Sequence, residues 1–199
     1  MPGSPPAEAV DGLAGIVMAA GQGRRMGRPK AALRVRGVPM VRLAAEAALR
    51  VCGAGVWVVT GSHRAAIAVA LADCPVALVH NRRWARGLGS SLEAGLAAVA
   101  GRCRAALVLP CDLPGVTAAD LARLAAAWAA NPDHPAAAGF AGTVGAPAIL
   151  PCRCFAELPT DGDAGAGSWL RTRDTLTVVD IPAAARDVDS PADLAAARR

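Results

Sequence analysis

Residues 18–30 read M-A-A-G-Q-G-R-R-M-G-R-P-K and continue an apolar run that begins at Leu13. The stretch holds three glycines, three arginines and Lys30, the only lysine in 199 residues. Glycine adopts positive φ and has no side chain, so backbone N–H groups in such a turn can approach an anion closely. The stretch therefore predicts a polyphosphate-binding loop after a first strand. A glycine-rich turn with solvated basic residues is the simpler alternative, and spacing alone does not decide between them.

The spacing does exclude two standard phosphate-binding motifs. The dinucleotide fingerprint G-x-G-x-x-G would need its third glycine where Met26 stands, one residue before Gly27. The Walker-type loop needs Ser or Thr after its lysine, whereas Ala31 follows Lys30. The acid that dinucleotide-binding proteins carry about 20 residues further on is also missing. An NAD-dependent oxidoreductase is therefore disfavoured.

The pattern A-A-G-x-G-x-R-M-G-x-P-K resembles the signature of nucleotidyltransferases that carry a cytidylyl or guanylyl group to an acceptor phosphate. The nearest resemblance is to the branch that acts on the molybdenum cofactor. It implies that Arg25 faces the β- and γ-phosphates and that Lys30 neutralises charge near the α-phosphate. It also implies a nucleotide-binding turn that consists of Ala19, Ala20, Gly21 and Gly23.

The composition indicates a globular protein. The chain is 54% hydrophobic and 19% charged, and its length suits one domain, expected at 13–199 after a proline-rich, disordered lead-in at 1–12. The net charge of +5 would by itself be compatible with binding to a nucleic acid. However, four Trp, two Phe and no Tyr leave little surface for stacking bases, and the basic residues concentrate near the predicted phosphate loop. We therefore expect no nucleic-acid partner.

The sequence predicts neither a signal peptide nor a membrane span. No positively charged segment leads into an apolar one at the N-terminus, and no apolar run reaches about 18 residues. We expect a cytoplasmic protein with no membrane partner, whose six cysteines are small buried hydrophobes. The pair Cys152 and Cys154 lacks a second pair at metal-ligand spacing, so a zinc site is disfavoured.

Short apolar runs alternate with segments of helical period, which is typical of a mostly parallel sheet covered by helices. The fold class we predict is α/β, a Rossmann-like three-layer arrangement, and the resemblance implies the nucleotide-diphospho-sugar transferase type. The predicted strands are Leu13–Ala19, Gly55–Thr60, Pro75–His80, Ala105–Leu109, Gly142–Leu150 and Leu176–Ile181. The predicted helices begin near Met40, pass through Ile67 and Leu71, span Leu92–Val99 and Thr117–Ala130, and begin at Ser190.

Polar residues follow the third predicted strand, in the segment N-x-x-W-x-x-G-x-G-S-S-L that starts at Asn81. In open α/β sheets ligands bind at the carboxyl ends of strands, so these groups lie at the correct edge. The alternative is structural, with Ser91 capping the next helix and Trp84 packing over it. The resemblance implies that this segment reads the nucleobase, with Ser91 as the base contact, Ser90 second, and Asn81 as a further nucleotide-binding residue.

Asp112 directly follows the fourth predicted strand and points towards the predicted phosphate loop. A triphosphate would repel this carboxylate unless a hard cation lay between them, so Mg²⁺ is the expected cofactor. A turn between Asp112 and Pro114 is the structural alternative. The resemblance implies that Asp112 is a catalytic metal ligand. It implies a second metal ligand in the pattern D-x-D-S-P-x-D-L, where Asp187 is preferred over Asp189.

The acceptor side of the site rests on resemblance alone. A G-x-P segment and a G-D-x-G-A turn are similar to acceptor-binding segments of the family, and they contribute Gly145, Pro147 and Asp163. Gly167 stands where the family has an arginine. Arg171 or Arg173, on the helix expected to follow, could substitute for that arginine.

The resemblance implies a Mg²⁺-dependent transfer of CMP from CTP to the terminal phosphate of molybdopterin or the molybdenum cofactor. GTP is the alternative nucleotide, and Ala20 favours CTP because guanylyl-transferring relatives carry glycine there. A sugar or isoprenoid phosphate is the alternative acceptor. A molybdoenzyme is a further partner to be considered, and a purely non-catalytic partner that delivers the cofactor to it is the non-enzyme alternative.

Overall fold

The computed structural model describes residues 9–23 and 29–198. Within them, seven strands form one sheet in the order β5-β4-β1-β6-β8-β7-β9. β8 is antiparallel to both of its neighbours, whereas the other pairings in the sheet are parallel. The strands of this sheet are β1 Leu13–Ala19, β4 Val56–Thr60, β5 Ala77–His80, β6 Ala105–Pro110, β7 Ala136–Phe140, β8 Thr143–Pro151 and β9 Thr177–Asp180. The predicted α/β fold with a mostly parallel sheet is confirmed.

β1 lies inside the sheet, between β4 and β6, and every one of its seven residues is buried. An unbroken apolar run without polar alternation is what a parallel strand covered on both faces requires. Two glycines allow its helices to approach. A Cβ at Gly15 would lie 3.4 Å from Ala48 Cβ of the helix at 40–49, and a Cβ at Gly95, in the helix at 88–99, would lie 2.6 Å from Ile16 Cγ2. Helices thus pack closely on both faces of β1, and the glycine-rich turn follows at its carboxyl end.

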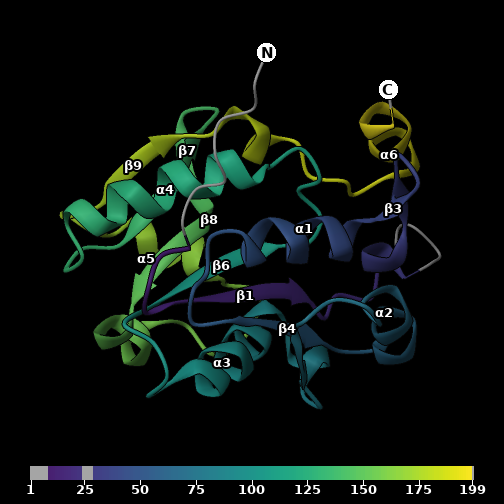
Figure 1. Ribbon diagram of the computed structural model, residues 1–199, viewed down its shortest axis with the longest axis horizontal. Helices are drawn as coiled ribbons and strands as arrows, with labels where there is room; N and C mark the ends of the chain where they lie inside the picture. The colour runs from purple at the N-terminus through teal and green to yellow at the C-terminus, as the bar shows by residue number, and fades with distance from the viewer. Residues whose placement is uncertain (1–8, 24–28, 199) are drawn as a thin grey trace.

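Helices cover both faces of the sheet (Figure 1). α1 and α4 pack on one face and α3 and α5 on the other, each pair with its own buried apolar cluster. The helices are α1 Met40–Leu49, α2 Arg64–Ala70, α3 Leu88–Val99, α4 Ala118–Ala130, α5 Ala166–Leu170 and α6 Pro191–Ala197. Short 3-10 helices are η2 Lys30–Ala32, η3 Trp84–Arg86, η4 Cys152–Glu157 and η5 Pro182–Ala185, and β2 Arg34–Val35 pairs with β3 Val38–Pro39.

Besides small shifts in strand bounds and the unpredicted pair β2 and β3, three elements differ from the sequence prediction. α3 begins at Leu88, four residues before the predicted Leu92, because Gly87 at φ 104° supplies the break that starts it. β7 was not predicted, since the run A-A-A-G-F in Ala136–Phe140 has no β-branched residue to signal a strand. α5 ends at Leu170, so Arg171 caps the helix and Arg173 lies beyond it.

The domain begins earlier than residue 13. Residues 1–8 of the expected lead-in lie outside the described residues, but the N–H of Val10 already donates to the carbonyl of Val51 at 2.8 Å.

Of the six free cysteines, three are buried as expected, and Cys74, Cys103 and Cys152 are partly exposed. None of the described helices combines the length and apolar character needed to cross a membrane. The cytoplasmic location stays a prediction.

Candidate active site

A cavity of about 910 Å³ opens at the carboxyl edge of β1 and β6, where the glycine-rich turn, the loop after β6 and the loop before α6 meet. Its lining contains most of the predicted site residues. These are Ala19, Ala20, Gly21, Gly23, Lys30, Ser91, Asp112, Asp163 and Asp187. The structure thus brings residues from distant parts of the sequence, from Ala19 to Asp187, together on one surface. Arg25 lies outside the described residues.

Neighbouring loops hold the glycine-rich turn in place. A Cβ at Gly61, in the loop after β4, would lie 2.4 Å from the carbonyl oxygen of Ala20, so only glycine permits this approach. His63 Nε2 lies 3.2 Å from the carbonyl oxygen of Gln22. Gly23 has φ 63°, the left-handed conformation that glycine favours. Gly23 thus has the positive φ that the prediction of an anion-binding turn uses, and the binding of an anion there stays a prediction.

Lys30 lies between two carboxylates. Its Nζ donates to Asp112 Oδ2 at 2.7 Å and also forms an ion pair with Asp189, and its side chain is only 14% exposed. Burial by itself lowers the pKa of the Lys30 ammonium, but the charges and hydrogen bonds of Asp112 and Asp189 outweigh it and raise the pKa. Lys30 is therefore a fixed positive charge over the whole physiological pH range.

Three carboxylates form a cluster that could hold a metal ion. One oxygen each from Asp112, Asp187 and Asp189 lies within 4.8 Å of the others. Two hydrogen bonds between backbone groups bring the loops into place: Cys111 N–H donates to Met18 O at 3.2 Å, and Val188 N–H donates to Asp112 O at 2.9 Å. Hard divalent cations take oxygen ligands of this kind, so the residues present fit Mg²⁺ or Mn²⁺.

The surroundings of Asp187 raise the pKa of its carboxyl group, although the residue as a whole is exposed. Its partial burial raises its pKa, and the nearby charges of Asp189 and Asp112 raise it further, while Lys30 opposes them. Carboxylates that crowd together in this way repel one another, and a divalent cation removes that repulsion. The repulsion between these carboxylates thus favours a divalent cation, as does the arrangement of their oxygens.

Asp189 was weighed in the sequence analysis but not chosen, and the structure places it in direct contact with Lys30. It is positioned by a capping box at the start of α6. Ser190 Oγ accepts from Asp193 N–H, while Asp193 Oδ2 accepts from the N–H groups of Ser190 at 2.7 Å and Asp189 at 3.1 Å. The D-x-D pattern in the sequence marks both aspartates as candidate metal ligands. Only the position of Lys30 distinguishes them.

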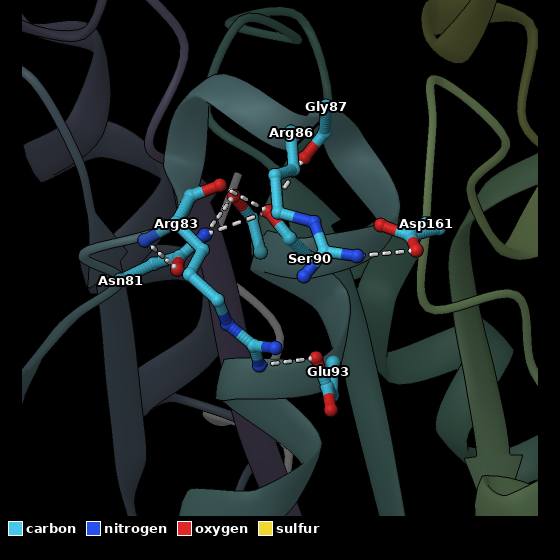
Figure 2. A network of polar contacts seen from close by, with 8 residues as sticks. Asn81, Arg83, Arg86, Gly87, Ser90, Glu93 and Asp161 are labelled. Atoms are coloured by element: carbon cyan, nitrogen blue, oxygen red, sulfur yellow. Dashed lines mark hydrogen bonds and ion pairs between the residues drawn. The ribbon is translucent and has the colours of Figure 1, made fainter.

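Asn81 and Ser90 do not line the cavity, whereas Ser91 does, and Asn81 donates to both serines. Figure 2 shows Asn81 and Ser90 in one polar network with Arg83. Asn81 Nδ2 donates to Ser90 Oγ and to Ser91 Oγ, each at 3.0 Å, and Asn81 Oδ1 accepts from Arg83 N–H. Ser90 Oγ lies 2.9 Å from the carbonyl oxygens of both Arg83 and Gly87. Ser91 Oγ has no acceptor among the described residues, so its proton is available to a ligand. The first residue of α3 is preceded by Gly87 as N-cap, so the alternative in which Ser91 caps this helix is wrong.

The predicted acceptor segments border a second cavity, of about 320 Å³, next to the first. Asp163 lines both cavities, and so does Ala146, whereas its neighbours Gly145 and Pro147 line neither. Of the two arginines considered as substitutes at position 167, Arg171 lines the second cavity and Arg173 does not. Trp84 and Phe140, which the sequence analysis did not place in the site, line the first cavity.

Known proteins resemble this chain in sequence and in fold. Nicotine blue oxidoreductase of Paenarthrobacter nicotinovorans is 33% identical in an alignment 175 residues long, which covers 82% of this chain and 84% of that protein. The structure of Rv0371c from Mycobacterium tuberculosis H37Rv matches with a TM-score of 0.80 at 23% identity and covers 96% of this chain and 98% of that one. A complex of Rv0371C with manganese matches with a TM-score of 0.75 at 22% identity, over 93% and 97% of the two chains.

Molybdopterin-guanine dinucleotide biosynthesis protein A from Archaeoglobus fulgidus has the same fold, with a TM-score of 0.65 at 15% identity over 93% of this chain and 96% of that one. At such identities these structures show the fold alone. The family comparison covers more of the site: residues 15–178 match the MobA-like NTP transferase domain, a stretch that includes the glycine-rich turn, Lys30, Ser91 and Asp112. The chain therefore belongs to the family of MobA-like NTP transferase domains and is an enzyme of the nucleotidyltransferase class.

Proposed function

We propose that the enzyme transfers CMP from CTP to the terminal phosphate of molybdopterin or the molybdenum cofactor, with Mg²⁺ as its metal. The observation that carries the proposal is the contact of Lys30 with Asp112 and Asp189 on the wall of the cavity that the glycine-rich turn also lines. A cation and a carboxylate cluster beside an anion-binding turn are the groups that a metal-bound triphosphate requires.

The reaction needs no general base. A phosphate monoester has a second pKa near 6, so most of it is a dianion at pH 7 and is itself a nucleophile. One of its oxygens forms a bond to the α-phosphorus of the nucleotide while the bond from that phosphorus to the β-phosphate oxygen breaks, and the electron pair leaves with pyrophosphate. The charges on this cavity surface suit positioning and charge neutralisation, which supply most of the rate in phosphoryl transfer.

Each described residue would have one task. The backbone of Ala20, Gly21 and Gly23 would bind the phosphates, and Lys30 would neutralise charge that develops near the α-phosphate. Asp112, Asp187 and Asp189 would hold the metal ion, which supplies Lewis-acid polarisation of phosphate oxygens when bound. Arg25, outside the described residues, would contact the β- and γ-phosphates.

The choice of CTP rests on two features. Ala20 replaces the glycine that the resemblance associates with guanylyl transfer. Ser91, with its unused donor in the cavity, would read an acceptor atom of the base, with Ser90 and Asn81 behind it. GTP remains the alternative nucleotide, and both would be tested together.

A second candidate is supported by the 33% identity with nicotine blue oxidoreductase, whose name assigns it an oxidoreductase activity. A nicotinamide cofactor could use the same anion-binding turn. The lysine and carboxylate cluster favours nucleotidyl transfer instead, because hydride transfer has no use for three aspartates that suit a divalent metal.

The decisive experiment mixes the purified chain with Mg²⁺, molybdopterin and each of the four NTPs, and measures pyrophosphate. We expect release with CTP that depends on both metal and molybdopterin. Parallel reactions contain NADH or NADPH with a redox dye and follow nicotinamide absorbance. Oxidation of the nicotinamide without pyrophosphate release from any NTP would reject the proposal in favour of the second candidate. Release with GTP in preference to CTP would correct the nucleotide alone.

A further inference from the structure

Two of the three partly exposed cysteines are in contact with each other. Cys103 precedes β6, and Cys152 begins η4 directly after β8, so the two residues are 49 positions apart in the sequence. Their Sγ atoms lie 3.3 Å apart. We expected small buried hydrophobes from the sequence, whereas these are two neighbouring thiols that are only partly covered by the rest of the protein.

The antiparallel pairing of β6 with β8 holds the backbone of the two cysteines together. The last pair of this ladder is Ala105 with Pro151, and one step further the N–H of Cys152 donates to the carbonyl of Arg104 at 2.9 Å. The S–S bond of a disulfide is about 2.05 Å long, so the two sulfur atoms need to approach by only about 1.2 Å. Rotation about the side-chain bonds is sufficient for a movement of this size.

Each thiol also has a carbonyl acceptor for its proton. Cys103 Sγ donates to the carbonyl of Val99 at 3.4 Å, and Cys152 Sγ donates to the carbonyl of Cys103 at 3.0 Å. The contact between the sulfur atoms therefore does not depend on a proton between them. A separation of about 3–3.5 Å between reacting atoms is typical of a near-attack arrangement, in which a bond forms with little further loss of freedom.

Cys154, the third cysteine of this region, takes no part in the contact. It is buried in the apolar cluster that α3 and α5 share with the sheet. Within residues 9–23 and 29–198, the three aspartates of the first cavity are the one group of three or more acidic, histidine or cysteine ligands that lie close together. The cysteines thus do not form a metal site, and oxidation to a disulfide is the chemistry that suits a pair of thiols.

The two thiols would have different tasks in such an oxidation. Burial and the contact with Cys152 raise the pKa of the Cys103 thiol to about 12, so its thiolate is scarce at neutral pH. The first attack on an external disulfide is therefore assigned to Cys152. Cys103 then attacks a sulfur atom with which it is already in contact, and this proximity offsets the small fraction of thiolate.

We propose that Cys103 and Cys152 form a reversible disulfide by exchange with a low-molecular-weight disulfide, of which glutathione disulfide is the probe. Cys152, as a thiolate, attacks one glutathione sulfur, the S–S bond of glutathione disulfide breaks, and one glutathione leaves and takes up a proton. Cys103 loses its proton, bonds to the Cys152 sulfur and displaces the second glutathione, which also takes up a proton. Two protein thiols are oxidised, and one glutathione disulfide is reduced to two thiols.

The bond closes a loop that contains β6, α4, β7 and β8. A disulfide stabilises mainly by restricting the unfolded chain, and long loops gain the most. It joins the amino end of β6 to the carboxyl end of β8, at the edge of the sheet opposite the carboxyl end of β6, where the cavities open. The oxidised protein is therefore more stable, with its cavities unchanged.

Oxidation of the full chain tests the pairing directly. The reduced protein is incubated with glutathione disulfide near neutral pH, the remaining thiols are alkylated, and the tryptic peptides are identified by mass. Trypsin cuts after Arg153, which separates Cys152 from Cys154. We expect the loss of two hydrogen atoms per chain, a link between the peptides that contain Cys103 and Cys152, and full reversal by dithiothreitol. The melting temperature of the oxidised chain should exceed that of the reduced chain by at least about 4 °C.

Three variants provide the controls. Cys103→Ser should retain one glutathione on Cys152 as a mixed disulfide, because no second thiol displaces it, and oxidation should not raise its melting temperature. Cys152→Ser should form no link at Cys103. Cys74→Ser is the matched control, since Cys74 is the third partly exposed cysteine, and it should form the bond and gain the same melting temperature as wild type.

Full alkylation of Cys103 and Cys152 after oxidation of the wild-type chain, a link from either to another cysteine, or a lasting glutathione adduct on Cys152 would overturn the inference. A linked protein that melts at the same temperature as the reduced one would overturn the stabilising role. These measurements do not involve a nucleotide, so their failure leaves the proposed nucleotidyl transfer standing, and failure of that transfer leaves the disulfide standing.

Discussion

Lys30 and Arg171 are the two basic residues that line the adjoining cavities, among the residues the structure describes, and their surroundings are opposite. Lys30 is mostly buried and held by two carboxylates, while Arg171 is exposed and has no ion-pair partner among the described residues. Preorganised charge lowers a barrier because no reorganisation is needed at the moment of reaction. An unpaired arginine on an apolar wall is instead a binding group. The difference suggests that the chemistry is built into the first cavity and the choice of acceptor into the second.

The largest expected effect tests the first half of this comparison. Lys30→Ala and Asp112→Ala should each lower pyrophosphate release at least about a hundredfold, since removing one preorganised electrostatic contact costs about 3 kcal/mol of barrier. Initial rates at saturating CTP and Mg²⁺ measure this.

Thermal unfolding provides the control for these two variants, whose folds we expect to stay intact. Arg173→Leu is the matched loss of charge away from the cavities, and it should keep its rate. Near wild-type release in either Lys30→Ala or Asp112→Ala would show that the residue concerned is not catalytic, and would reject the view that the first cavity carries the chemistry.

The next effect concerns the two aspartates of the D-x-D pattern. Asp189 forms an ion pair with Lys30, whereas Asp187 feels the charge of Lys30 without a hydrogen bond or ion pair to it in the described part of the chain, although both belong to the carboxylate cluster. We expect Asp187→Asn to raise the Mg²⁺ concentration for half-maximal rate about tenfold, with a rate largely recovered at high Mg²⁺. Asp189→Asn should also lower the maximal rate, because Lys30 loses one of its two partners. Metal titrations of the rate separate the two, and identical behaviour would show that the Lys30 contact has no catalytic weight.

A smaller effect is expected at Ser91. Ser91→Ala removes the hydroxyl donor and the bond that Asn81 makes to it, but leaves Asn81 and Ser90 bonded to each other. The kcat/KM for CTP should fall about tenfold while that for GTP changes less, since a lost hydrogen bond to the correct base is worth about 1 kcal/mol or more. Competition between the two nucleotides measures the ratio directly. An equal loss for both would mean that Ser91 supports the loop and does not read the base.

These expectations also show which features the sequence could predict. β1 and the glycine-rich turn were predictable because an unbroken apolar run and a cluster of glycines are local signals. The capping boxes of α4 and α6 are equally local and form as their sequences indicate. β7 was missed because its alanines carry no strand signal, and its place is decided by pairing with β8 and β9.

The candidate site was predictable at the level of segments and less so at the level of single residues. Lys30 and Asp112 stand beside strands whose carboxyl ends must meet, so their proximity followed from the fold. The contact of Asp189 with Lys30 joins residues 159 positions apart, and no local pattern distinguishes it from Asp187. The availability of Arg171 depends on Glu157 and Trp169 occupying Arg173, which sequence spacing does not reveal.

The smallest effect separates two capping boxes of the same type. Thr117 and Asp120 cap α4 away from the cavities, while Ser190 and Asp193 cap α6 next to Asp189. Thr117→Ala should cost about 1 kcal/mol of stability and leave activity unchanged. Ser190→Ala should lower activity a few-fold, because the box orients the backbone of Asp189. Denaturant unfolding and initial rates on both variants measure the two effects.

The pH dependence of stability gives a further test of the capping box of α4. Burial opposes ionisation of Asp120, but hydrogen bonds from Thr117 and the charge of Arg123 outweigh it, so the pKa of Asp120 is lowered on folding. A carboxyl with a lowered folded pKa contributes stability above its unfolded pKa, near 4, and loses it as the pH falls through the folded value. Asp120→Asn should therefore destabilise the protein at pH 7, and the difference from wild type should shrink as the pH falls through the lowered folded pKa of Asp120. A difference that persisted at low pH would show that the amide disturbs the helix start sterically, and that the charge of Asp120 is not what stabilises α4.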